Sequence, residues 1–299
     1  MIINQLIKNK LIAPPSFIPN NIVYLVTMGS HAYGINKKDS DIDLYSICLP
    51  PKEIIFPHLN GEIFGFDLQI KRFEQYSQHH IMYNKLEYDI VVYNIVKFFR
   101  LASDGSPNCI DALFVPANCI RYITETGNMI RENRHLFLSK KLWHTYKGYS
   151  FSQKHKMLSK TFENSKRKEE VQKFGYSVKY ACHLVRLLNE IEQILTEGDL
   201  DLQRNREQLK SIRRGEWKME DIENYFNDKE KQLEKIYLES QAIPMKIREG
   251  EIKQLLIDCL EHHYGSLSSI CPQPDRYLKA LREIKLVVDS SLQYERTGK

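Results

Sequence analysis

The chain has 299 residues, enough to bury a sizeable core in one large domain or two ordinary ones. Hydrophobic residues make up 42% and charged residues 27%, a balance typical of globular proteins in water. No apolar run reaches the roughly 18 residues that a membrane span requires, and the N-terminal stretch lacks a signal-peptide pattern. These features exclude an integral membrane protein, and the net charge of +5 allows a polyanionic partner without requiring one.

The six cysteines are widely spaced and include no CxxC pair, so the spacing of a zinc–thiolate site is absent. Free thiols in a reducing compartment are the simplest interpretation. We therefore expect a cytoplasmic protein with no membrane association.

Strand patterns are concentrated in the first hundred residues. The apolar run IVYLVTM at 22–28 predicts a buried strand that ends at Gly29, and the following SHAYG predicts a short helix or turn. DIDLYSICL at 41–49 predicts a second strand, which a Pro-Pro pair ends. The stretch 61–81 predicts a strand followed by a helical pattern.

The stretch 86–108 predicts a strand and then a helix, with Asn94 as the N-cap and Gly105 and Pro107 after its end. From there onward strand patterns fade and helical periodicity dominates, interrupted by a charge-dense connector at 160–172. The simplest organisation is a mixed α/β N-terminal half followed by an all-helical half.

Two aspartates stand one residue apart in the second predicted strand. Because side chains alternate along a strand, Asp41 and Asp43 point to the same side, with Cα atoms roughly 6.5–7 Å apart. Their carboxylates repel each other unless a cation lies between them, and such hard oxygen ligands suit Mg²⁺, or Mn²⁺ in its place. A two-metal site of this kind needs a third carboxylate. Asp89 is the candidate, and Glu87, on the same strand face, is the reserve.

A glycine turn stands just before this acidic pair. Gly29 after a strand lets backbone N–H groups approach phosphate oxygens, and the Ser30 hydroxyl adds a donor. Taken alone, an Asp-x-Asp at a strand end is more often a solvated edge, and a Gly-Ser pair before a helix is a weaker pattern still. The order of strand, Gly-Ser, connector and Ser-Asp-x-Asp on a second strand favours a catalytic site over a solvated strand edge.

These residues resemble the signature of the DNA polymerase beta nucleotidyltransferase superfamily. GSHAYG at 29–34 with SDID at 40–43 is similar to its predicted-nucleotidyltransferase branch, found in bacteria and phages. Further blocks that match this branch lie at 89–114, 175–190 and 212–217. The resemblance implies an α+β fold, in which a small mixed β-sheet with flanking helices carries the metal site and a mainly helical C-terminal region follows. The expected division is a nucleotidyltransferase catalytic domain at residues 1–115 and a helical, substrate-binding domain at 116–299.

Carried over residue by residue, the resemblance implies that Gly29 and Ser30 hold a nucleoside triphosphate, with ATP as the first choice. It implies that Asp41 and Asp43 bind two Mg²⁺ ions and that Asp89 is the third carboxylate. It does not supply the acceptor.

The segment 174–195 predicts a helix that is apolar around most of its circumference and therefore buried. Its narrow polar strip holds Lys179, His183, Arg186 and Glu190. Buried charges need partners. In one interpretation, two cations of the strip neutralise nucleotide phosphates while the histidine orients substrate or moves a proton. In the other, the strip is salt-bridged or faces solvent, with Glu190 answering Arg186 at i, i+4.

Two pairs of adjacent histidines, His79–His80 and His262–His263, are the other ligand-type residues of note. Because adjacent residues do not share a helix face, we expect neither pair to form a metal site.

The sequence thus predicts a Mg²⁺-dependent nucleotidyltransferase that moves a nucleoside monophosphate from a triphosphate to an acceptor hydroxyl. The basic charge and the long helical half favour an RNA or tRNA 3′ end as the acceptor. A protein side chain or a small molecule is the alternative within this class. An alternative from another class is a nucleotide-sensing or antitoxin-like partner-binding module without turnover. The sequence predicts no oligomeric state.

Overall fold

The computed structural model describes the chain apart from residues 39, 57–71, 160–164, 266–280, 282 and 289–299. The chain forms two compact units, one of residues 1–50 and 73–263 and one of residues 51–72 and 264–299. The second unit contains α4 (Lys52–Ile55). Just after this helix, the ring of Phe56 packs edge to face against the ring of Tyr264. The elements discussed below belong to the first unit, apart from the last residue of α13 (Glu249–Tyr264).

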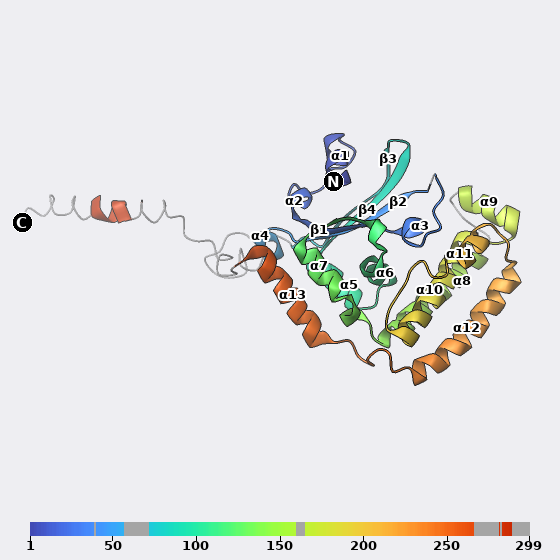
Figure 1. The fold of residues 1–299 in the computed structure, drawn as a ribbon. Helices are drawn as coiled ribbons and strands as arrows, with labels where there is room; N and C mark the ends of the chain where they lie inside the picture. Colours follow the sequence, from blue (N-terminus) through green and yellow to red (C-terminus); the bar gives the residue numbers. More distant parts are fainter. Residues whose placement is uncertain (39, 57–71, 160–164, 266–280, 282, 289–299) are drawn as a thin grey trace, which may run out of the picture. The chain divides into compact units, whose positions relative to one another are not determined.

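The first unit is built on a five-stranded mixed sheet with the strand order β3-β4-β2-β1-β5 (Figure 1). Only β2 and β4 run parallel, and each other neighbouring pair is antiparallel. Asn84 and Lys85, both with positive φ, form the two-residue turn between β3 and β4, as in a type I′ hairpin. The strands are β1 (Ile22–Thr27), β2 (Ile42–Cys48), β3 (Gln75–Tyr83), β4 (Leu86–Asn94) and β5 (Ile120–Ile123).

The predicted strands at 22–28, 41–49 and 86–94 are confirmed as β1, β2 and β4. The strand expected at the start of 61–81 lies outside the described residues, which resume at residue 72. The helical pattern expected after it is wrong, because the last residues of this stretch form the edge strand β3. Pairing with β4 outweighs the local pattern there. β5 lies just beyond the expected domain boundary at 115 and is too short to show a periodicity, and the catalytic and substrate-binding division stays a prediction.

One face of the sheet is covered by the N-terminal helices α1 (Ile2–Lys8) and α2 (Ile18–Asn21), whose apolar side chains pack on β1, β2 and β4 in one buried cluster. The helices α5 (Ile95–Ser103), α6 (Pro107–Phe114) and α7 (Glu125–Glu132) lie against the other face (Figure 1). As predicted, Asn94 caps α5: its side-chain oxygen accepts a hydrogen bond of 2.9 Å from the Val96 N–H.

The helical half is centred on α10 (Val178–Glu197), which packs against neighbouring helices and is buried as predicted. The neighbours are α8 (Lys141–Leu158), α9 (Ser165–Phe174), α11 (Arg206–Arg213) and α12 (Met219–Glu239), and α13 (Glu249–Tyr264) follows them. Short 3-10 turns lie at Ala117–Cys119 and Arg134–Phe137. The connector expected at 160–172 is in part wrong, because α9 begins within it.

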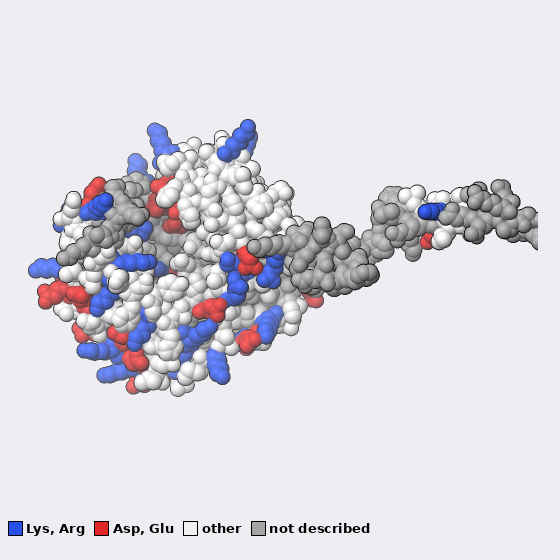
Figure 2. Space-filling model, turned by 180° about the vertical axis from the view of Figure 1, so that it is seen from behind, with Lys and Arg blue, Asp and Glu red and all other residues white. Residues whose placement is uncertain are grey.

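Figure 2 shows that Lys and Arg side chains are interspersed with Asp and Glu over the helical part of the face it presents. Cross-helix ion pairs account for some of this mixing, such as Lys147 of α8 with Glu230 of α12 at 2.9 Å. None of the helices in the described residues combines the length and apolar content needed to cross a membrane. The five described cysteines are buried and free.

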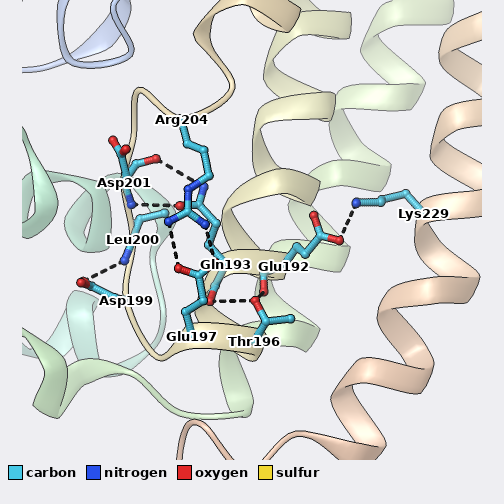
Figure 3. Close-up of polar contacts among 9 residues, drawn as sticks. All are labelled: Glu192, Gln193, Thr196, Glu197, Asp199, Leu200, Asp201, Arg204 and Lys229. Atoms are coloured by element: carbon cyan, nitrogen blue, oxygen red, sulfur yellow. Dashed lines mark hydrogen bonds and ion pairs between the residues drawn. The ribbon is translucent and has the colours of Figure 1, made fainter.

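The C-terminal end of α10 is fixed to the loop that follows it (Figure 3). The Gln193 side chain accepts a hydrogen bond of 3.0 Å from the Asp201 N–H and donates one of 3.3 Å to the Asp201 carbonyl. On the other side of the helix, Lys229 of α12 donates to Glu192 at 2.6 Å. This loop then reaches the short helix α3 (Gly29–Ala32) that follows β1, since the Gln203 amide donates to the Ala32 carbonyl at 3.1 Å.

Candidate active site

A cavity of about 620 Å³ lies on the sheet face opposite α1, between the strands β2 and β4 and the helices α8 and α10. Each residue predicted as a site residue lines it: Gly29, Ser30, Asp41, Asp43, Asp89, Lys179, His183 and Arg186. Residues separated by up to 157 positions in the chain therefore share one hollow.

The three predicted carboxylates lie at one end of this cavity. Asp43 in β2 and Asp89 in β4 occupy paired positions of the parallel ladder, and Asp41 stands one residue before β2. Burial, together with the negative charges of Asp41 and Asp89, raises the pKa of Asp43 from 3.8 to about 6. The reserve candidate Glu87 is not among the lining residues, and its carboxylate instead contacts the His80 imidazole.

The glycine turn is fitted closely to this acidic group. β1 leads into α3 (Gly29–Ala32), and the Met28 N–H donates to the Asp43 carbonyl at 2.7 Å. Gly29 has φ +62°, and a Cβ atom at this position would lie only 1.9 Å from Asp43 Oδ2. Only glycine tolerates both the backbone conformation and the close approach of the carboxylate.

The donor set fits a divalent cation and the phosphate groups that accompany it. Three carboxylates on neighbouring segments offer hard oxygen ligands. The raised pKa of Asp43 reflects first its burial and then the negative charges of Asp41 and Asp89 beside it. The Ser30 hydroxyl is buried and has no hydrogen-bond partner among the described residues. A buried polar atom of this kind at a cavity wall is satisfied when a ligand or water occupies the cavity.

Arg186 on α10 lies in a buried ionic network at the cavity wall. It forms ion pairs with Asp111 of α6 and, at 3.0 Å, with Glu190. It also donates a 2.6 Å hydrogen bond to the Tyr33 hydroxyl, and its guanidinium stacks on the Tyr33 ring at 4.3 Å. The salt-bridged interpretation therefore holds for Arg186, and its role as a phosphate ligand stays a prediction.

His183 and Lys179 lie about one and two turns before Arg186 along the same strip, and both are half-buried at the cavity wall. The ammonium of Lys179 is close enough to lower the pKa of Asp43, against the larger effects of burial and the two neighbouring aspartates. Lys179 thus presents positive charge beside the acidic group.

The cavity also has lining residues that the sequence did not single out, among them Lys37, Tyr149, Gln153, Tyr180 and Arg213. Arg213 stands in the block 212–217, whose resemblance to the family was the available signal. The α8 residues gave no signal, because nothing in a helical pattern tells which turn faces a cavity.

The reason for setting aside His79 and His80 is wrong, because both lie on strand β3 rather than on a helix. His80, Glu87 and Asp89 bring ligand-type atoms within 4.8 Å of one another. His262, in contrast, lies on α13 and contacts Thr126 at 3.0 Å and Glu125 at 3.3 Å, away from the cavity-lining residues.

Comparison with known proteins gives a family and two further similarities. A family model described as RlaP, the RNA repair pathway DNA polymerase beta family, matches residues 3–278. Over 124 residues the chain is 27% identical to an uncharacterized 38.9 kDa protein in the nrdC-mobD intergenic region of Enterobacteria phage T4. That match covers 40% of this chain and 34% of the phage protein, so it spans about a third of the relative's length.

A solved structure, of a nucleotidyltransferase-like protein from Exiguobacterium sibiricum 255-15, aligns with 94% of this chain and 78% of its own. The identity is 10% and the TM-score 0.29, a score that supports no conclusion by itself.

Proposed function

We propose a reaction for this chain, which belongs to the RlaP family, the RNA repair pathway DNA polymerase beta family: it is a divalent-metal-dependent nucleotidyltransferase. An acceptor hydroxyl attacks the α-phosphorus of a nucleoside triphosphate, preferentially ATP. A new P–O bond forms to the acceptor, the bond to the β-phosphate bridging oxygen breaks, pyrophosphate leaves, and the hydroxyl proton passes to solvent.

One observation carries the proposal: Asp41, Asp43 and Asp89 line the same end of the cavity as Gly29 and Ser30. Like charges clustered in a partly buried place weaken a fold unless they serve to bind cations. The glycine turn beside them offers N–H groups and a hydroxyl with an unfilled hydrogen-bonding capacity. Carboxylates next to a phosphate-binding turn are the parts that metal-dependent phosphoryl transfer requires.

The chain's own residues then have distinct tasks. Asp41, Asp43 and Asp89 hold the metal, which when bound supplies positive charge to the attacking and leaving oxygens. Gly29 and Ser30 hold the β- and γ-phosphates. Lys179 adds positive charge on the helical wall, and His183 orients the nucleotide or the acceptor. Positioning and charge neutralisation supply most of the rate enhancement.

For the acceptor we propose RNA, in agreement with the description of the family. The mildly basic chain and the cavity residues Lys37 and Arg213 favour a polyanion. Tyr149 at the same wall is about half exposed and offers a ring face to an unpaired base.

The test uses ATP labelled at the α- or the γ-phosphate, with tRNAs, oligoribonucleotides with 3′-hydroxyl or 3′-phosphate ends, and proteins as acceptors, in Mg²⁺ or Mn²⁺. We expect the α-label, and not the γ-label, on an RNA acceptor. Asp41→Asn and Asp43→Asn should abolish the transfer, whereas Asp228→Asn, an exposed position of α12, should leave it intact.

A binding module without turnover predicts the opposite pattern. It would bind ATP without labelling any acceptor in either metal ion. It would also keep its affinity for a partner after Asp41→Asn. Transfer of the γ-label would indicate a kinase and would likewise contradict the proposal.

A further inference from the structure

The edge strand β3 is irregular at one point of its ladder with β4. Between two regular pairs of that ladder, two residues of β3, His79 and His80, stand opposite the single residue Asp89 of β4. One extra residue on one strand is a β-bulge, a feature that re-aims side chains beside functional sites. Here the residue opposite the bulge is the proposed third carboxylate.

The bulge has an unusual backbone conformation. His80 has φ +57°, in the left-handed region that residues with a Cβ seldom adopt. A strained conformation of this kind persists only where the surrounding contacts favour it. The contacts of His80 therefore indicate what the bulge does.

Those contacts converge on β4. The backbone N–H of His80, which the bulge releases from the ladder, donates a 2.8 Å hydrogen bond to Asp89 Oδ1. The imidazole of His79 lies 3.5 Å from the other oxygen, Oδ2. The imidazole of His80 contacts Glu87, on the same strand face two residues before Asp89. Both carboxylate oxygens of Asp89 are thus approached from the bulge.

We propose that the β3 bulge at His79 and His80 positions Asp89 for the cation that it shares with Asp43. The backbone N–H of His80 holds one oxygen of Asp89, which fixes the plane of the carboxylate and removes the need to order it when metal binds. His79 and His80 are positioning residues, because they act through Asp89. The inference rests on the proposed function, since it assigns the origin of metal affinity at the same site.

The test is a series of substitutions at position 80 that differ in how well the new residue tolerates the left-handed backbone conformation. The binding of Mn²⁺ alone is measured by calorimetry or electron spin resonance. His80→Val should weaken Mn²⁺ binding by about tenfold or more, a magnitude usual for the loss of a group that orients a metal ligand. His80→Ala should weaken it less, and His80→Gly and His80→Asn least, because glycine and asparagine tolerate the left-handed conformation. Met82→Val, at an exposed position of the same strand, is the control.

Equal Mn²⁺ affinity in all the variants would overturn the inference. A loss of Mn²⁺ affinity in His80→Gly as large as in His80→Val would also overturn it, because the imidazole and not the backbone conformation would then determine the affinity. Should His80→Val fail to fold, the comparison of His80→Ala with His80→Gly decides. Mn²⁺ binding that needs Asp41 and follows this series, in a protein without transfer activity, would support the inference and refute the proposed function. Transfer activity together with equal Mn²⁺ affinity in all the variants would support the proposed function and refute the inference.

Discussion

Asp43 and Asp89 occupy paired positions in neighbouring parallel strands, although 46 residues separate them in the chain. The pairing of β2 with β4 brings the two carboxylates to one end of the cavity, where Asp41 joins them. In the metal-free protein the mutual repulsion of these carboxylates destabilises the folded state.

In the metal-free protein, Asp43→Asn should increase the free energy of unfolding at pH values well above 6. The pKa of Asp43 is raised in the folded state from 3.8 to about 6, which corresponds to a cost of about 2–3 kcal/mol for the ionised form. Between pH 3.8 and about 6 the folded state binds a proton that the unfolded state has released. The increase in unfolding free energy caused by the substitution should therefore be small near pH 3.8 and grow as the pH rises to about 6. Urea unfolding in a chelator, as a function of pH, measures it.

With Mn²⁺ added, the wild type should become more stable than Asp43→Asn. The ion binds the folded state and stabilises the wild type more than the variant, which has lost one of the ligands. A variant that is less stable than the wild type in the chelator at every pH would contradict the proposed crowding of charge.

Gly29→Ala should reduce nucleotidyl transfer by about 100-fold or more, since a misplacement of about 1 Å is enough for such a loss. The new methyl group would lie 1.9 Å from Asp43 Oδ2, so the carboxylate has to move. The matched change is Gly148→Ala in α8, where an added Cβ meets no atom within 4 Å. It should keep full transfer and stabilise the helix by about 0.5–1 kcal/mol. Initial rates and thermal unfolding of both variants give the comparison.

Arg186→Met should lower the free energy of unfolding by about 3–5 kcal/mol, because it leaves two buried carboxyl groups, Asp111 and Glu190, without their cation. Glu190→Gln should cost about 1 kcal/mol or less. Burial raises the pKa of Glu190 well above its usual range, because it penalises the charged carboxylate. The neutral amide avoids that desolvation cost, and Asp111 still pairs with Arg186. Denaturant unfolding measures both, and equal losses in the two variants would contradict this assignment.

Lys179→Ala should weaken the binding of a nonhydrolysable ATP analogue by about 10- to 100-fold, the size of a lost charge-assisted hydrogen bond to phosphate. The control is Lys231→Ala, at an exposed position of α12. An equal affinity of the two variants for the analogue would remove Lys179 from the nucleotide site.

The parts of the fold that the sequence predicts are those with a strong local pattern. The apolar run of β1, the capping Asn94 and the buried α10 follow from periodicity and capping chemistry within a few residues. Motif spacing predicts the carboxylates and the glycine turn, and the structure places them around one cavity. β3 could not be predicted as a strand, because its pattern is set by pairing with β4 and broken by the bulge.

The buried ionic network shows the same limit within the site. Helix spacing predicts the pairing of Glu190 with Arg186 in one of its two interpretations. Asp111, in contrast, is 75 residues away in the chain and reaches Arg186 only through the packing of α6 against the helical half. No local pattern carries that information. The same holds for Tyr149 and Gln153, which share the cavity wall only because α8 packs beside α10.

The most direct test is a crystal structure with Mn²⁺ and a nonhydrolysable ATP analogue, in which the anomalous signal locates the metal. We expect manganese within ligand distance of the carboxylates of Asp41, Asp43 and Asp89, with the analogue's phosphates beside Gly29 and Ser30. Manganese bound elsewhere, or nucleotide phosphates held away from these carboxylates, would contradict the account.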